Sequence, residues 1–290
     1  GHPKNASGAY YNFVHYGVTQ KDERIDYDAL ETQAIELKPQ LLLAGASAYS
    51  RQLDFERLGQ IARKVGAKFM VDMAHIAGLV AAGLHPSPVP HADVCTMTTH
   101  KTLRGPRGGA IVASKDWIKQ INSAVFPGVQ GGPLMHAVAA KAIAFKEALQ
   151  PEFKTYQQQV IDNAGCLANE LQGRGFRLVS GGTDNHLMMV DLRGPNGPGI
   201  TGAEAEDALH AAGITVNKNL IPFDPEKPML TSGIRLGTPA VTSRGFKQPQ
   251  MVQVADFIDC ALRNTHNANL LAEIRAEVLE LCSQFKIYDF

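Results

Sequence analysis

The chain lacks the features that would assign it to several large classes of protein. It has no long hydrophobic run, because its longest weakly polar stretch, residues 76–84, is too short to cross a bilayer and is diluted with alanine and glycine. No signal-peptide pattern is visible. Its 28 basic and 28 acidic residues cancel, so no net field attracts nucleic acid or an anionic membrane. These absences predict a cytoplasmic protein with no nucleic-acid or membrane partner.

Cysteines and nucleotide-binding motifs are also scarce. The four cysteines lie far apart, without a CxxC pair or a metal-type spacing: Cys95, Cys166, Cys260 and Cys282. We expect buried, reduced thiols and no metal site. There is no Walker pattern, and no GxGxxG opens a helix after a strand, which argues against nucleoside triphosphates and dinucleotides as ligands.

The pattern of residues 40–113 predicts an α/β fold. Four short apolar runs have the length of strands: 41–43, 68–71, 94–97 and 110–113. Between the first two runs, Asp54 can cap a helix over 55–65 that Gly66 ends. Strands that are apolar throughout and separated by helices indicate a mostly parallel sheet sandwiched by helices.

Helices predominate after residue 115, and after Gly173 the pattern changes to short strands mixed with helices. We predict helices at 116–125, 134–149, 154–171 and 203–212, and a helical region from Pro249 onward. We predict further strands at 177–180, 187–192, 215–216 and 233–236. The change in pattern predicts a large-domain remainder over residues 1–150 and a smaller C-terminal α+β domain over residues 151–290.

Lys101 is the residue that indicates chemistry most directly. It lies between the apolar run 92–97 and the glycine-rich turn 105–109, and no acidic residue occurs in the range 96–111. A solvated surface charge is the ordinary alternative. However, three basic side chains are close in sequence: His100, Arg104 and Arg107. Neighbouring cations and partial burial both favour the free amine, which attacks carbonyls, so we predict a Schiff-base lysine.

Polar side chains follow the neighbouring strands, and ligands of parallel sheets bind at the carboxyl ends of the strands. Asp72 is either a turn carboxylate or the partner of a pyridinium nitrogen, if Lys101 carries pyridoxal phosphate. His75 and His100 lie on either side of the lysine in the predicted site, although a lone histidine is more often structural. Ser47 either begins a turn or binds a cofactor oxygen.

Two further features could bind anions. Arg235 lies inside an apolar strand, where its guanidinium needs either an internal salt bridge or a substrate α-carboxylate. The pair Gly131-Gly132 precedes a predicted helix and could expose backbone N–H groups to a phosphate, or it could simply form a turn.

Taken together, these segments closely resemble the serine hydroxymethyltransferase family of fold-type-I pyridoxal-phosphate enzymes. The resemblance covers essentially the whole chain. The segments that carry it are 71–75 (VDMAH), 98–103 (TTHKTL), 105–109 (GPRGG), 126–128 (FPG), 130–133 (QGGP), 181–186 (GGTDNH), 217–219 (NKN) and 231–239 (TSGIRLGTP).

The resemblance implies a role for each matching residue. Lys101 would form the Schiff base with the cofactor, and Asp72 would pair with the pyridine nitrogen. Other residues would line the cofactor: Ser47 and His75 on its phenolic oxygen side, and His100, Thr98 and Thr99 beside the Schiff base. Arg107 would position the lysine loop and Arg235 would bind the amino-acid carboxylate. Gly131 and Gly132 would meet the phosphate of the neighbouring subunit, and the folate contacts would be Asn219, Lys227, Pro228 and Met229.

The implied reaction transfers a one-carbon unit between L-serine and tetrahydrofolate, giving glycine and 5,10-methylenetetrahydrofolate. Pyridoxal 5'-phosphate is the cofactor, tetrahydrofolate the co-substrate, and a homo-oligomer, dimer or tetramer, with a shared active site the expected assembly. The resemblance also implies that a substantial N-terminal portion of the family has no counterpart here. We therefore expect the chain, as written, to be poorly stable and essentially inactive alone, which a serine-dependent folate assay would test.

Two alternatives are kept. One is a folate-independent fold-type-I aldolase acting on threonine, which a test of folate dependence would separate from the first interpretation. The other is a non-catalytic truncated chain that assembles with full-length subunits, which co-purification would reveal.

Overall fold

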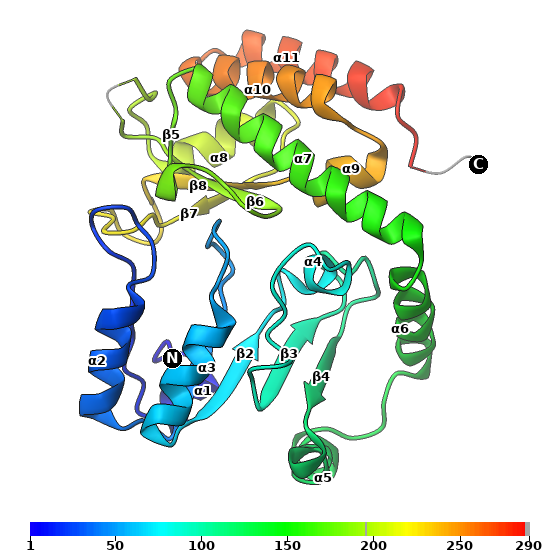
Figure 1. Cartoon of the computed structure of the whole chain (residues 1–290). Coiled ribbons are helices and arrows are strands. Elements are labelled where there is room, and N and C mark those ends of the chain that lie inside the picture. Colours follow the sequence, from blue (N-terminus) through cyan, green and yellow to red (C-terminus); the bar gives the residue numbers. More distant parts are fainter. Residues whose placement is uncertain (195, 288–290) are drawn as a thin grey trace.

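The computed structural model describes residues 1–194 and 196–287, which contain two four-stranded sheets (Figure 1). The first sheet has the order β1-β2-β3-β4, with β1 (Leu41–Ala44), β2 (Lys68–Asp72), β3 (Val94–Thr98) and β4 (Gly109–Ala113). The first three strands are parallel and β4 is antiparallel to β3. The predicted mostly parallel sheet is therefore confirmed, and each of its strands was located within one residue at either end.

The edge strand β4 is less covered than its apolar sequence indicated. Ile111 and Val112 are adjacent, so their side chains point to opposite faces of the sheet, and each is 40% exposed. The central strand β2, in contrast, buries Phe69 and Val71 almost completely.

Helix α3 (Phe55–Val65) has the boundaries that its sequence predicts. The Asp54 carboxylate accepts a hydrogen bond from the Arg57 backbone N–H at 2.9 Å and so caps the first turn. Gly66 ends the helix with φ 73°, a left-handed conformation that glycine adopts without steric cost. The remaining helices of this half are α1 (Ala6–Tyr10), α2 (Tyr27–Leu37), α4 (Ala77–Ala81), α5 (Lys115–Ser123), the π-helical turn η1 (Ala124–Val129) and α6 (Met135–Ala148).

The second sheet is antiparallel, with the order β5-β6-β8-β7. Its strands are β5 (Arg177–Leu178), β6 (Leu187–Asp191), β7 (Asn217–Asn219) and β8 (Gly233–Gly237). The strand predicted at 215–216 is wrong in position, because the polar segment Asn217–Asn219 forms the edge strand instead. Its pairing with β8, rather than any apolar pattern, makes it a strand. The other elements are α7 (Pro151–Gly173), the 3-10 turn η2 (Val179–Gly181), α8 (Gly202–Ala211), α9 (Pro239–Arg244), α10 (Gln248–Arg263) and α11 (Ala268–Ser283).

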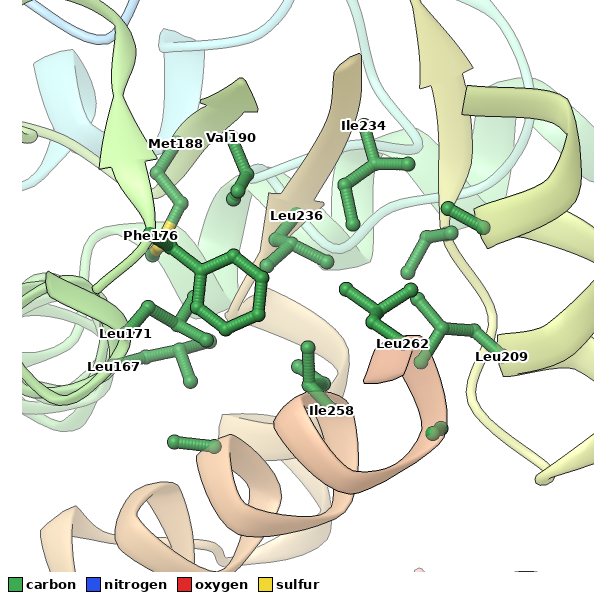
Figure 2. Packing of buried hydrophobic residues seen from close by; sticks show 14 of the residues in the cluster. Leu167, Leu171, Phe176, Met188, Val190, Leu209, Ile234, Leu236, Ile258 and Leu262 are labelled. Atoms are coloured by element: carbon green, nitrogen blue, oxygen red, sulfur yellow. The ribbon is translucent and has the colours of Figure 1, made fainter. Parts of the chain in front are cut away.

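The core of this second half lies between the sheet and its helices (Figure 2). Met188 and Val190 alternate along β6 and point to this core, as do Ile234 and Leu236 of β8. They pack against Leu171 of α7, Ile258 of α10 and Phe176, which lies between α7 and β5.

Helix α7 contributes to the cores of both halves. Phe153, near its start, belongs to the core of the first sheet, whereas Leu167 and Leu171 belong to that of the second. Polar contacts also join the halves: the Arg51 guanidinium lies 2.7 Å from the Asp184 carboxylate. The domain division near residue 150 therefore stays a prediction.

In the part of the chain that the structure describes, no helix is long and apolar enough to span a membrane. The same residues contain no group of three or more histidine, cysteine, aspartate or glutamate side chains that could hold a metal ion.

Candidate active site

The carboxyl ends of β1, β2 and β3 meet at one edge of the first sheet, and polar residues gather there. Asp72 and Thr98 are the last residues of β2 and β3, and Ser47 follows β1 by three positions. The turn after β1 crosses the end of β2 so closely that a Cβ on Gly45 would lie 2.3 Å from the Asp72 carbonyl oxygen. Only glycine fits there, and its φ of 143° is also one that other residues rarely adopt.

Asp72 is exposed rather than buried, unlike the residue directly before it. Its Oδ1 accepts a hydrogen bond from the Ala74 backbone N–H at 3.0 Å. Within residues 1–194 and 196–287, no basic side chain forms a salt bridge with it. The carboxylate is thus fixed in position and keeps acceptor capacity for a cationic group of a ligand.

Lys101 is half-buried, and hydrogen bonds fix the loop next to it. The Thr102 hydroxyl donates to the His75 carbonyl at 2.8 Å and accepts from the Gly78 N–H at 2.9 Å. The Gln157 side-chain amide, from α7, donates to the Thr102 carbonyl at 2.7 Å. These bonds tie the lysine loop both to the segment after β2 and to the long helix.

Gly78 allows this close packing and provides a test of it. In Gly78→Ala, the new Cβ would lie 2.2 Å from the Thr102 carbonyl oxygen and 2.6 Å from Gln157 Nε2. We expect a loss of about 1–3 kcal/mol in the free energy of unfolding, measured by urea denaturation, because the loop cannot move without breaking its hydrogen bonds. The control is Gly165→Ala on α7, where a Cβ meets nothing within 4 Å and helix propensity favours alanine by roughly 1 kcal/mol. Equal destabilisation by both changes would contradict this account.

His100 and Arg107 lie together within the lysine loop. The Gly108 N–H lies 3.3 Å from His100 Nδ1, and Arg107 Nη1 lies 3.3 Å from His100 Nε2. Both neighbours are donors, and a neutral imidazole has one acceptor nitrogen, so His100 accepts only one of these bonds at a time. Either bond orients the ring beside Lys101, in keeping with the predicted roles of both residues.

Arg235 extends from β8 across to the first sheet. Its Nη1 donates to the Ser47 carbonyl at 2.6 Å and its Nη2 donates to Asn217 Oδ1 at 3.0 Å. Among the described residues no carboxylate lies within salt-bridge distance of it, so the alternative of an internal salt bridge is wrong. Burial lowers the pKa of this guanidinium. A partly desolvated cation without a protein counter-ion is suited to an anionic ligand group.

His75 joins the two halves of the site. Its Nδ1 lies 3.4 Å from Nε2 of His186, a buried residue that directly precedes β6. Burial, followed by the positive charges of Lys101 and Arg235, lowers the pKa of His75 to about 4. His75 is therefore neutral at physiological pH, and it shares its surroundings with both cations.

For the other predicted site residues, the described part of the structure shows only their local surroundings. Gly131 and Gly132 lie in an exposed loop before α6, where an added Cβ would meet nothing within 4 Å. Asn219 uses its side-chain amide on the adjacent Leu220 carbonyl at 2.7 Å. Lys227, Pro228 and Met229 form an exposed turn. Their predicted contacts with phosphate and folate stay predictions.

Sequence reasoning missed several residues that hold the site together. Asn217 lies opposite Arg235 in the β7–β8 ladder, and that pairing places its side chain on the guanidinium. Gln157 lies in a glutamine-rich stretch of a helix and His186 ends the polar segment 181–186, and only the tertiary contacts show their roles.

The fold is that of an α/β protein with a mostly parallel sheet. Its strand ends carry a half-buried lysine after β3 and an acid at the end of β2, as expected for fold type I. The sequence model described as "Serine hydroxymethyltransferase" matches residues 2–258. A protein named serine hydroxymethyltransferase from Ralstonia pickettii (strain 12J) is 58% identical over 284 residues, which cover 98% of this chain and 68% of that protein. The chain belongs to the serine hydroxymethyltransferase family. The predicted family and its class of one-carbon transferase are thereby confirmed, and neither match favours the aldolase.

Proposed function

We propose that the edge around Lys101 is the active site for transfer of a one-carbon unit between L-serine and tetrahydrofolate. The observation that carries the proposal is the half-buried lysine at the carboxyl end of a parallel sheet. Near it lie an arginine that pairs with no carboxylate among the described residues and an aspartate with free acceptor capacity. Membership in the family supports the reaction, and the contacts around Lys101 support the choice of residues.

The residues present fit pyridoxal 5'-phosphate as the cofactor. Lys101 offers an amine to its aldehyde, and the Asp72 carboxylate keeps acceptor capacity for its protonated ring nitrogen. When bound, this cofactor withdraws electrons from the α-carbon of an attached amino acid and so weakens the bonds there. The protein's part is to hold and orient the cofactor and the amino acid.

The remaining side chains bind and orient the substrate in this proposal. Arg235 binds the α-carboxylate of serine or glycine with the N–H groups that Ser47 and Asn217 leave free. Thr98 donates its hydroxyl to the Ala74 carbonyl at 3.3 Å and so fixes the backbone after Asp72. We place His100, held in the lysine loop, beside the reacting carbon.

The oligomeric part of the proposal concerns Gly131 and Gly132, which we place against the cofactor phosphate of a neighbouring subunit. Large apolar side chains on either side of them are exposed, as expected of a surface that another chain covers: Phe126 (61%), Val129 (82%), Leu134 (67%) and Met135 (67%). We likewise propose the folate contacts at Asn219 and at Lys227, Pro228 and Met229. We also propose a cytoplasmic location, in keeping with the four free cysteines.

Coupling between glycine and folate tests the substrate assignment. In the protein loaded with pyridoxal phosphate, tetrahydrofolate is expected to raise the affinity for glycine about 5- to 150-fold, and glycine to raise that for folate by the same factor. Isothermal titration in both orders measures the two factors. The folate-independent aldolase predicts no change in glycine affinity, and that result would overturn the assignment.

A further inference from the structure

The contact between His75 and His186 is an edge-to-edge hydrogen bond between two rings. Their centroids are 5.7 Å apart with planes at 26°, whereas His75 Nδ1 and His186 Nε2 are 3.4 Å apart. The nitrogens are thus 2.3 Å closer than the centroids, which is about the sum of two imidazole radii. The two nitrogens therefore lie between the rings, close to the line of centres, where one N–H can be shared.

His186 is held rigidly from the second sheet. It is 5% exposed, and its carbonyl accepts a hydrogen bond from the Thr238 N–H at 3.0 Å. The preceding Asn185 donates its side-chain amide to the Tyr49 carbonyl at 3.1 Å, so the segment is anchored to the first half of the molecule as well. The imidazole position is therefore set by both sheets.

Both rings are neutral. Burial is the main cause that lowers the pKa of His186 to about 3, and the basic groups that act on it all lower it further: His75, Arg235, His85 and Lys101. The same burial, with Lys101 and Arg235, lowers the pKa of His75 to about 4. No acid is among the causes that shift the pKa of His186, and Asp184 raises only the pKa of the neighbouring His85. Each ring then carries one N–H and one acceptor nitrogen.

The buried nitrogen of His186 decides which tautomers form. Its Nδ1 is buried and has no hydrogen-bond partner among the described residues. A proton on Nδ1 would leave an orphaned N–H in the interior, which is rarer in proteins than an unpaired acceptor. The proton therefore resides on Nε2 of His186 and is donated to Nδ1 of His75. His75 must then carry its own proton on Nε2.

We infer that His186 is a positioning residue that holds His75 in the Nε2–H tautomer, so that His75 presents a hydrogen-bond donor to the Lys101 edge. In the part of the chain that the structure describes, no protein group bonds His75 Nε2, which leaves this donor to a ligand oxygen. The inference rests on the proposed function only in treating that edge as the ligand site.

Nitrogen-15 NMR of histidine-labelled full chain, without added cofactor, tests this inference. His75 is expected to show a protonated Nε2 and an unprotonated Nδ1 at neutral pH, and His75→Gln identifies its signals by their loss. In His186→Phe, which keeps an aromatic ring but no donor, we expect His75 to become a mixture of tautomers. His186→Gln, whose amide nitrogen can replace Nε2 as a donor, should restore the single tautomer.

Two results would overturn the inference: a proton on Nδ1 of His75 in the unchanged protein, or an unaltered single tautomer in His186→Phe. The first needs no variant, so a His186 variant that fails to fold leaves the test intact. Failure of the proposed function would be visible separately, as the absence of a Schiff base at Lys101 when pyridoxal phosphate is added.

Discussion

Replacing Lys101 with alanine is expected to abolish the visible absorption that pyridoxal phosphate gives with the protein. In an assembly that completes the active site, the same change is expected to lower serine turnover by at least about a thousandfold. The reason is the position of Lys101: it is half-buried and follows β3, the strand that pairs with β2, which ends at Asp72. Its loop is fixed by Thr102 and Gln157, so a more distant lysine cannot replace it without unfolding that loop. Absorption titration and a serine–folate assay measure the two effects.

Lys119→Ala is the matched control for this prediction. Lys119 is an exposed residue on α5, and its removal should leave both absorption and turnover unchanged. A second variant, Lys101→Arg, keeps the positive charge but cannot form the Schiff base, so it should behave like Lys101→Ala. Normal absorption in Lys101→Ala would show that the aldehyde condenses elsewhere.

Replacing Arg235 with leucine is expected to weaken binding of serine and glycine by on the order of 10²–10³-fold, because it removes the partner of a desolvated carboxylate. Arg235→Lys should recover only part of this loss, since an ammonium cannot make the bidentate contact of a guanidinium. The measured quantity is the amino-acid dissociation constant of the cofactor-loaded protein.

The Arg235 prediction must be separated from a loss of structure, because this side chain also bonds the Ser47 carbonyl. Asn217→Ala provides the comparison: it removes the other support of the guanidinium and leaves the charge in place. We expect its effect on amino-acid affinity to be about tenfold or less. If Arg235→Leu instead lost cofactor binding while amino-acid affinity per loaded site stayed normal, the carboxylate role would be wrong.

The sequence predicted the local structure of this fold well where a local signal existed. Asp54 and Gly66 delimit α3 because a cap and a left-handed glycine act within one helical turn. The strands of the first sheet were found because each is a short apolar run between turns. β7 was misplaced because its residues, Asn217–Asn219, are polar, and only the neighbouring β8 makes them a strand. Pairing with a strand that is distant in the sequence cannot be predicted from a local pattern.

The candidate site divides in the same way. The sequence placed Ser47, Asp72 and Lys101 after three strands of one predicted sheet. Because β1, β2 and β3 are parallel, their carboxyl ends lie at the same edge. Arg235 has no carboxylate partner among the described residues, and its contact with Ser47 depends on packing between the halves, which no local pattern encodes. The same holds for His186, whose partner is 111 positions away in the chain.

The most direct test of the central claim is to identify the lysine that condenses with pyridoxal phosphate. The protein is mixed with the cofactor, reduced with borohydride to make the linkage permanent, digested and analysed by mass spectrometry. This account predicts one pyridoxyl group per chain, on the peptide that contains Lys101. Modification spread over exposed lysines such as Lys119, with Lys101 unmodified, would contradict it.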